Sequence, residues 1–124
     1  MKLQPDQSDA PTITGYGPGW VGVGPDRITH NVVIGSHGER FEWAGSFDLL
    51  GPEHFAQLAE WKVEVVIFGS GPRIRFPKPA WLAPLAQRRI GVETMDTPAA
   101  CRTYNILAQE GRDVAVALLL DVPS

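Results

Sequence analysis

The second half of the chain alternates between strand-like and helix-like segments, and this alternation restricts the fold more than any other feature of the sequence. Runs rich in β-branched and apolar residues predict strands at Val63–Phe68, Ile90–Met95 and Asp113–Leu120. Helices are expected between them, at Pro79–Arg89 and from Pro98 to about Glu110. Such alternation is typical of parallel strands joined by helical crossovers, and the last strand, apolar on both faces, is expected at the centre of the sheet.

Proline, threonine and glycine mark the expected helix ends. Thr97 is suited to an N-cap and Pro98 to the first helical position, while Gly111 is expected just beyond the C-terminus of the same helix. Pro84 weakens the preceding helix, because a proline in a helix interior costs about 3 kcal/mol or more. In that helix Leu82, Leu85 and Ala86 are expected to face inward.

The first half of the chain is β-like. Short strands separated by glycine turns are expected at Thr12–Tyr16, Trp20–Val23, Ile28–Ile34 and Arg40–Trp43, followed by a helix that opens at Pro52. The two halves together predict an α/β fold: a three-layer single domain with a central mixed, mostly parallel sheet and additional antiparallel strands from the N-terminal half. These additional strands are expected at an edge of the sheet or in a second layer. The domain is expected to span residues 12–124, after a flexible tail at residues 1–11.

Composition excludes several classes of function. The net charge of −3 argues against a global electrostatic grip on nucleic acid. A single cysteine, Cys101, excludes an internal disulfide, and the three scattered histidines show no metal-ligand spacing, so no metal or cofactor is predicted. No run approaches the roughly 18 apolar residues of a membrane span, and the start resembles no signal or transit peptide, so a cytoplasmic location is expected.

The turn Gly69-Ser70-Gly71 is the first candidate site. It directly follows a predicted buried strand, and open α/β sheets bind ligands beyond the carboxyl ends of such strands. Two glycines also let a backbone approach another group closely. The alternative is that these residues only form a tight exit turn. A second glycine pattern, Gly17-Pro-Gly-Trp-Val-Gly22, has the letters of a dinucleotide-binding loop, but no helix can follow it, so a β-turn is expected.

Positive charge is concentrated just after the 69–71 turn. Residues 65–92 contain five basic residues and no acidic one: Arg73, Arg75, Lys78, Arg88 and Arg89. Arg73 and Arg75 alternate around Ile74, which would place both guanidinium groups on one side of an extended segment. We expect this block to face an anionic ligand or an acidic protein surface, with an ordinary solvated surface as the alternative.

The step from strand to helix at Glu93–Pro98 is the second candidate site. Asp96 and Thr97 are able to cap the free N–H groups of the helix, and capping alone would explain both residues. Cys101 lies in the first turn, where the helix dipole lowers a thiol pKa. A nucleophilic cysteine also needs a nearby base, and none can be placed from the sequence. A small core residue is therefore the favoured interpretation of Cys101.

Several segments taken together resemble a known family. They are the strand ending in Gly69-Ser70-Gly71, the run Ile90–Thr97, the helix containing Ala99–Leu107, and Glu110-Gly111-Arg112 before an apolar strand. They look like the mitochondrial complex I assembly factor 3 family and its bacterial and archaeal relatives, which are labelled as a domain of unknown function. The resemblance covers about residues 12–121. The family turn is commonly Gly-Thr-Gly, and this chain has Ser70 at the middle position. It implies a compact three-layer α/β domain and a chaperone-like factor that binds a partner protein, with no catalytic residue carried over.

The leading hypothesis is a non-enzymatic interaction or assembly module with a protein partner, no nucleic acid and no membrane span. Its candidate contact surface comprises Gly69, Ser70, Gly71, Arg73, Arg75, Asp96 and Thr97. The alternative hypothesis is a protein that binds a small anionic ligand, or an enzyme acting on one. That site would lie between the 69–71 turn and the helix start at Thr97, with helix N–H groups pointing into a pocket.

Overall fold

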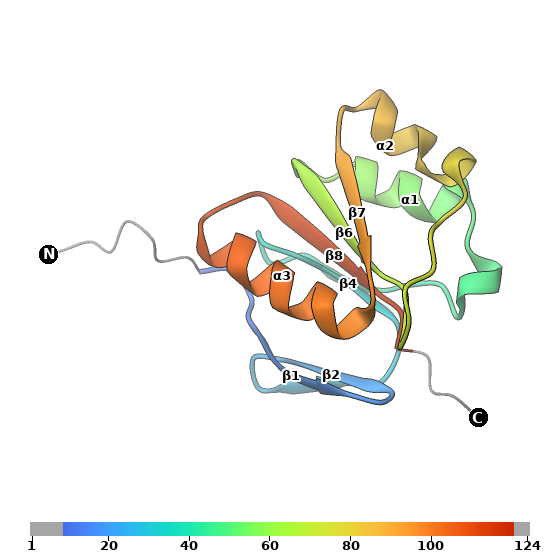
Figure 1. Cartoon of the computed structure of the whole chain (residues 1–124). Helices are drawn as coiled ribbons and strands as arrows, with labels where there is room; N and C mark the ends of the chain where they lie inside the picture. The colour runs from blue at the N-terminus through green and yellow to red at the C-terminus, as the bar shows by residue number, and fades with distance from the viewer. Residues whose placement is uncertain (1–8, 121–124) are drawn as a thin grey trace, which may run out of the picture.

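The computed structural model describes residues 9–120, which form two β-sheets and three α-helices (Figure 1). The strands are β1 (Ile13–Gly17), β2 (Trp20–Val23), β3 (Asp26–Ile28), β4 (Val32–Gly35), β5 (Arg40–Glu42), β6 (Val65–Gly69), β7 (Gly91–Met95) and β8 (Val114–Leu118). The helices are α1 (Pro52–Ala59), α2 (Ala83–Gln87) and α3 (Thr97–Gln109), with short 3₁₀ turns η1 (Phe47–Leu49) and η2 (Pro79–Leu82). None of the helices in this part of the chain is long and apolar enough to cross a bilayer.

The larger sheet is mixed and has the strand order β5-β4-β8-β6-β7. Strand β8 lies at its centre, as the apolar sequence of this segment predicts. Strands β7, β6 and β8 are parallel, whereas β4 pairs antiparallel with both β8 and β5. The parallel pairing is therefore confined to the strands of the second half of the chain.

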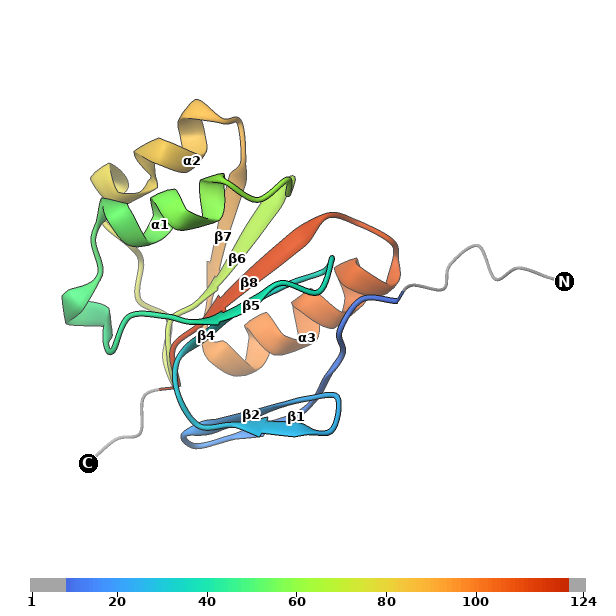
Figure 2. The same cartoon turned by 180° about the vertical axis from the view of Figure 1, so that it is seen from behind.

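Two apolar cores lie on the two faces of this sheet. Side chains alternate along β6, so that Val65 and Ile67 belong to the core beneath α3 while Val66 and Phe68 belong to the core beneath α1 and α2. Figure 2 shows α1 and α2 on one side of the sheet, and α3 with the β1–β2 hairpin on the other. The three-layer α/β domain predicted from the sequence is confirmed.

Three details of the elements differ from the predictions. The expected strand Ile28–Ile34 is two strands, β3 and β4, because the chain leaves the small sheet and enters the large one around Asn31. Pro84 does not interrupt a helix, since it lies in the first turn of α2, after the separate turn η2. Ala86 is exposed, and Trp81 and Leu85 are the buried residues of this region.

Helix α3 begins one residue earlier than predicted. Its N-cap is Asp96, whose Oδ1 accepts the N–H of Ala99 at 2.8 Å, and Thr97 is the first helical residue. The predicted end is confirmed: Gly111 has a φ of 82°, and its N–H donates to the carbonyl of Ala108. The N–H of Arg112 donates to the carbonyl of Leu107, which completes a Schellman motif.

The small sheet, with the order β1-β2-β3, packs against α3 rather than against the edge of the larger sheet. The glycine pattern at residues 17–22 forms the β1–β2 hairpin, as the β-turn interpretation predicts. Residues 1–8 of the expected tail, and residues 121–124 of the expected domain, lie outside the described residues. Pro11, assigned to the same tail, accepts a hydrogen bond at 2.9 Å from the hydroxyl of Tyr104 on α3.

Candidate functional site

The 69–71 turn, the start of α3 and the end of β8 meet at one edge of the larger sheet. The N–H of Gly71 donates to Oγ1 of Thr97 at 2.9 Å, and the N–H of Thr97 donates to the carbonyl of Gly71 at 2.8 Å. The Thr97 hydroxyl in turn donates to the carbonyl of Leu119 at 2.7 Å. We call this set of contacts the junction. The two candidate segments singled out in the sequence are therefore in direct contact.

Gly69 and Gly71 are required at the junction for different reasons. A Cβ on Gly69 would lie 2.9 Å from the Cβ of Ala100 and 3.2 Å from the Cα of Thr97, so only glycine lets α3 approach β6 this closely. Gly71 has a φ of 109°, a conformation that L side chains rarely adopt. Both residues are buried.

Ser70 is fully buried and fixes the loop that follows it. Its hydroxyl donates to the carbonyl of Arg73 at 2.9 Å and accepts the N–H of Arg75 at 2.7 Å. The guanidinium of Arg75 returns to the carbonyl of Ser70, with contacts of 3.0 Å from Nε and 2.6 Å from Nη2, and stacks 4.6 Å above the ring of Phe47. Ser70 and Arg75 thus hold the loop in one shape.

The loop formed by residues 72–78 shows apolar and basic side chains to solvent. Phe76 is 70% exposed and Ile74 is 48% exposed, and both Arg73 and Lys78 are exposed beside them. Within the described part of the chain, no carboxylate forms an ion pair with Arg73 or Lys78. We call residues 72–78 the docking loop from here on.

The start of α3 offers no free backbone donors to an anion. The N–H groups of Thr97, Ala99 and Ala100 donate to the carbonyl of Gly71, the Asp96 carboxylate and the Asp96 carbonyl, respectively. Pro98 has no N–H. Since helix N-termini bind anions through unsatisfied N–H groups, this helix start gives no support to the anionic-ligand hypothesis.

A cavity of about 360 Å³ nevertheless lies beside the junction, where that hypothesis expects a pocket. Its walls come from the β1–β2 hairpin, the 69–71 turn, the start of α3 and the end of β8. The side chains of its walls are Tyr16, Pro18, Pro72, Pro98 and Leu120, whereas Leu119 lines it next to Thr97 and has its side chain in the core beneath α1 and α2. The cavity is mostly apolar, and none of the basic block Arg73–Arg89 lines it. The sequence analysis missed the hairpin's contribution, because nothing in Tyr16–Gly19 indicates that it lies next to residues about 80 positions later.

Cys101 is buried in the core beneath α3, only 1% exposed. Burial raises the pKa of its thiol to about 12, in spite of the neighbouring Arg102, so the thiolate is not formed at neutral pH. The core interpretation of Cys101 is consistent with this environment, which is unlike that of a nucleophile.

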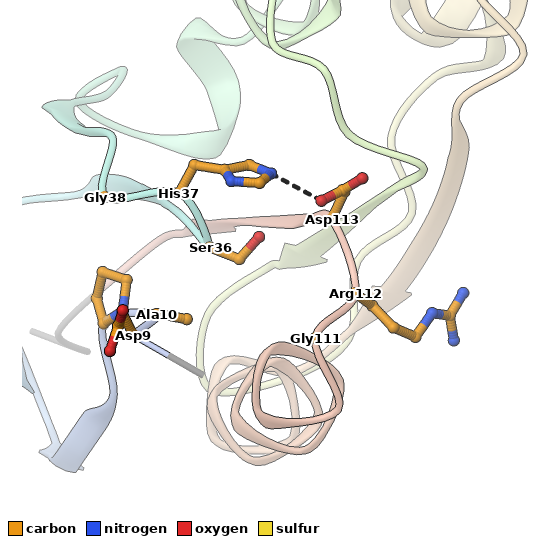
Figure 3. Close-up of a pocket in the computed structure, with 9 residues that line it drawn as sticks. Asp9, Ala10, Ser36, His37, Gly38, Gly111, Arg112 and Asp113 are labelled. Carbon is orange, nitrogen blue, oxygen red and sulfur yellow. Dashed lines mark hydrogen bonds and ion pairs between the residues drawn. The ribbon is translucent and has the colours of Figure 1, made fainter. Parts of the chain in front are cut away.

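At the opposite end of β8, a polar cavity of about 380 Å³ brings a serine, a histidine and an aspartate close together (Figure 3). The His37 Nε2 contacts Asp113 Oδ1 at 2.7 Å, but the Ser36 hydroxyl accepts the N–H of Val114 and has no contact with the His37 ring. His37 and Asp113 are about half exposed, so water screens their interaction. The three side chains do not form the relay that a serine nucleophile needs.

No group of three or more histidine, cysteine, aspartate or glutamate side chains between residues 9 and 120 is placed to hold a metal ion. The molecule is thus a three-layer α/β domain. Hydrogen bonds within the chain join the segments that meet at the carboxyl ends of β6 and β8, and an apolar cavity and an exposed loop lie beside this junction. The chain belongs to the family described as "Protein of unknown function (DUF498/DUF598)", whose model matches residues 13–119.

The family resemblance inferred from the sequence is confirmed by individual relatives. The chain is 38% identical over 95 residues to the human NADH dehydrogenase (ubiquinone) 1 alpha subcomplex assembly factor 3, which covers 74% of this chain and 47% of that protein. It is 31% identical over 117 residues to an uncharacterised protein of Rhodobacter capsulatus, which covers 94% of this chain and 90% of that protein. The chain therefore spans less than half the length of the human relative and nearly all of the bacterial one.

Solved structures show the same fold. A crystal structure of a protein from Bordetella parapertussis is 38% identical, with a TM-score of 0.84, over 90% of this chain and 97% of that one. A solution structure from Bordetella pertussis, described as an Mth938-like domain, is 34% identical with a TM-score of 0.80, over 100% of this chain and 95% of that one.

Proposed function

We propose that this protein is a non-enzymatic interaction module that binds an acidic surface of a partner protein through the docking loop. The observation that carries the proposal is an ordered loop that shows Phe76 and Ile74 to solvent between Arg73 and Lys78, two cations that form no ion pair with a carboxylate of the described chain. Aromatic and arginine side chains are the residues most enriched among interface hot spots.

The order of this loop supports the proposal. Ser70, Arg75 and Phe47 fix the backbone from below, so little conformational entropy remains to be lost when a partner binds. The predicted contact surface then divides into two groups. Arg73 is exposed and available for direct contact. The other six residues would act by support: Gly69, Ser70, Gly71 and Thr97 are buried, Arg75 is half-buried and bonded to Ser70, and Asp96 is half-buried and caps α3.

The relatives indicate where the partner is to be sought. Several are named as assembly factors of NADH dehydrogenase, and we infer that the partner of this chain is a subunit or assembly factor of the corresponding enzyme. The cytoplasmic location expected from the sequence belongs to the same proposal.

The test uses a photo-crosslinking amino acid at position 76 of the full chain, expressed in its native cells, with position 106 as the matched control. Ile106 is 59% exposed on α3, on the other face of the sheet, so it controls for nonspecific crosslinking at an exposed apolar position. We expect one partner, identified by mass spectrometry, to crosslink at position 76 and not at position 106.

The affinities of docking-loop variants for that purified partner then test whether the loop itself makes the contact. Phe76→Ser and Arg73→Glu are expected to weaken binding by roughly tenfold or more, since hot-spot truncations typically cost 1–2 kcal/mol or more. The surface substitution Arg89→Glu is the matched charge control and is expected to change affinity little. Equal crosslinking at both positions, or unchanged affinity of both docking-loop variants, would contradict the proposal.

A further inference from the structure

The apolar cavity beside the junction has a polar feature at its rim that the docking hypothesis does not use. The Tyr16 hydroxyl, on a ring that lines the cavity, accepts a hydrogen bond at 2.8 Å from Nη1 of Arg102 on α3. Accepting this bond leaves the O–H proton of Tyr16 free to donate, and no acceptor for it occurs among residues 9–120.

Arg102 is likewise available to a ligand. It is exposed, and no carboxylate within the described residues forms an ion pair with it. Tyr16 O–H and the remaining N–H groups of Arg102 therefore form an adjacent pair of donors, one neutral and one cationic. A carboxylate suits such a pair, since it accepts two hydrogen bonds and its bond from a guanidinium is charge-assisted.

The residues that line the cavity determine the chemical nature of the rest of the ligand, the part that carries the carboxylate. The side chains of Pro18, Pro72, Pro98 and Leu120 offer aliphatic surface. The one hydroxyl inside, that of Thr97, is already used by Gly71 and Leu119. A peptide would bring many backbone N–H and C=O groups into a mostly apolar site, which is costly where they find no partner. An aliphatic chain has no such groups.

We propose that this cavity binds a small monocarboxylic acid with an aliphatic chain. The chain lies against the three prolines and Leu120, and the carboxylate accepts from Tyr16 and Arg102. The volume of about 360 Å³ lies near the lower end of ligand-site volumes, roughly 300–1,000 Å³, which favours a medium-chain acid over a long one. Three prolines in the lining also make the walls stiff, so that the site needs little reorganisation on binding.

The proposal is tested by titrating the full chain with decanoate and observing backbone amide signals by NMR. We expect saturable shifts at Gly17, Gly19, Gly71 and Leu120, which surround the cavity, and none at Gly38 in the polar cavity at the other end of the sheet. 1-Decanol, which has the same chain without the carboxylate, is expected to bind about tenfold more weakly or worse.

Variants then assign the carboxylate contact. Tyr16→Phe and Arg102→Gln are each expected to weaken decanoate binding about fivefold or more, with unchanged affinity for decanol. Arg89→Gln, an exposed arginine far along the chain from this site, is the matched control and is expected to bind decanoate like the wild type. Absence of saturable shifts at the cavity amides, equal binding of acid and alcohol, or wild-type binding by Arg102→Gln would each overturn the proposal.

Discussion

The hydroxyl of Thr97 joins three segments of the chain through two hydrogen bonds. It accepts from Gly71 and donates to Leu119, residues that are 26 and 22 positions away in the sequence. Both partners are backbone groups, and both bonds are buried. The Thr97 side chain thus does what a neighbouring strand would do here. It satisfies the N–H of Gly71 and the C=O of Leu119, which lie beyond the last hydrogen bonds between strands β6 and β8.

Replacing Thr97 with valine tests this role, since valine keeps the shape and removes only the hydroxyl. We expect the free energy of unfolding to fall by about 1–3 kcal/mol, because the Gly71 N–H and Leu119 C=O lose a buried partner. Thr103→Val, on the same helix and half-buried, is the control and is expected to change stability by less than about 0.5 kcal/mol. Urea denaturation measures both. A Thr97→Val variant as stable as the wild type would contradict the role.

Gly69 permits the close approach of α3 to β6. Gly69→Ala would place a Cβ 2.9 Å from Ala100 Cβ and 3.0 Å from Leu118 Cδ2, so the helix or the strand must shift. We expect a loss of about 1–3 kcal/mol in the free energy of unfolding, as for other overpacked cores.

Gly91→Ala is the matched control for that variant. Gly91 is also in a strand of the same sheet, but a Cβ there meets no atom within 4 Å and its φ is not positive. The control is expected to be neutral or slightly stabilising, because alanine lowers the entropy of the unfolded chain. Equal losses for the two variants would show that close packing is not the reason for glycine at position 69.

The meeting of residues 69–71 with residues 96–97 could be predicted from the sequence, because the carboxyl ends of parallel strands share one edge of a sheet. The partners of individual atoms could not. Thr97 and Asp96 are both good caps in isolation, and the choice between them depends on where Gly71 and Leu119 lie. Arg75 was predicted to face outward beside Arg73, but its guanidinium returns to Ser70, a contact that depends on the curvature of the loop.

Helix α3 is the element that attaches the small sheet to the rest of the molecule. Asn105 presents both sides of its amide to Ile13 of β1: Oδ1 accepts the N–H and Nδ2 donates to the C=O, each at 2.8 Å. The side chain thereby imitates a neighbouring strand and occupies backbone groups at the free edge of β1, which would otherwise be open to pairing with another chain.

Asn105→Ala is expected to loosen the hairpin without unfolding the domain. Two part-buried hydrogen bonds are lost, so exchange of the Ile13 amide should become at least about fivefold faster, corresponding to about 1 kcal/mol of local stability. Amides of β6 and β8 should keep their protection. Gln109→Ala, an exposed substitution on the same helix, is the control. Hydrogen exchange followed by NMR gives both readouts, and loss of protection throughout the larger sheet would contradict a local role for Asn105.

Element boundaries could be predicted where local chemistry decides them. Gly111 ends α3 as expected, because a left-handed residue is needed there and glycine supplies it. The division of Ile28–Ile34 into two strands was missed, although Asn31 is a residue type that strands disfavour. What divides it is Asn31, whose amide donates to Ala44 and accepts from Leu120, contacts that exist only once the two sheets are formed.

At the scale of the whole molecule, the alternation of strands and helices was sufficient to predict the layers, because each apolar face must be covered. The sequence left open whether the N-terminal strands lie at an edge of the larger sheet or in a second layer, since the contacts with α3 that decide it join residues about 90 positions apart. Cys101 and Tyr104 are buried in the core between α3 and the two sheets, and both side chains are ionisable. Their burial couples the stability of the whole domain to alkaline pH.

Burial raises the pKa of Cys101 to about 12, and it also raises the pKa of Tyr104, with a smaller contribution from Glu39. Unfolded, these groups release their protons near pH 8.5 and 10, respectively. Between those values and the folded pKa values the unfolded chain binds fewer protons than the folded one, so the free energy of unfolding falls as pH rises.

Cys101→Ala isolates the cysteine part of this effect. Cys101 is the one ionisable group that differs between the two proteins, so the difference in their free energies of unfolding reports how the stability contribution of this thiol changes with pH. The wild type is expected to be the more stable at pH 7.5, because alanine leaves a small cavity. That advantage should shrink by about 2–3 kcal/mol by pH 10.5, since only the wild type then keeps a thiol protonated in the core at a pH where the unfolded chain has released that proton. Urea denaturation at a series of pH values measures the difference. Two parallel curves would mean that the Cys101 thiol titrates equally in the folded and unfolded chains, and that this core admits water.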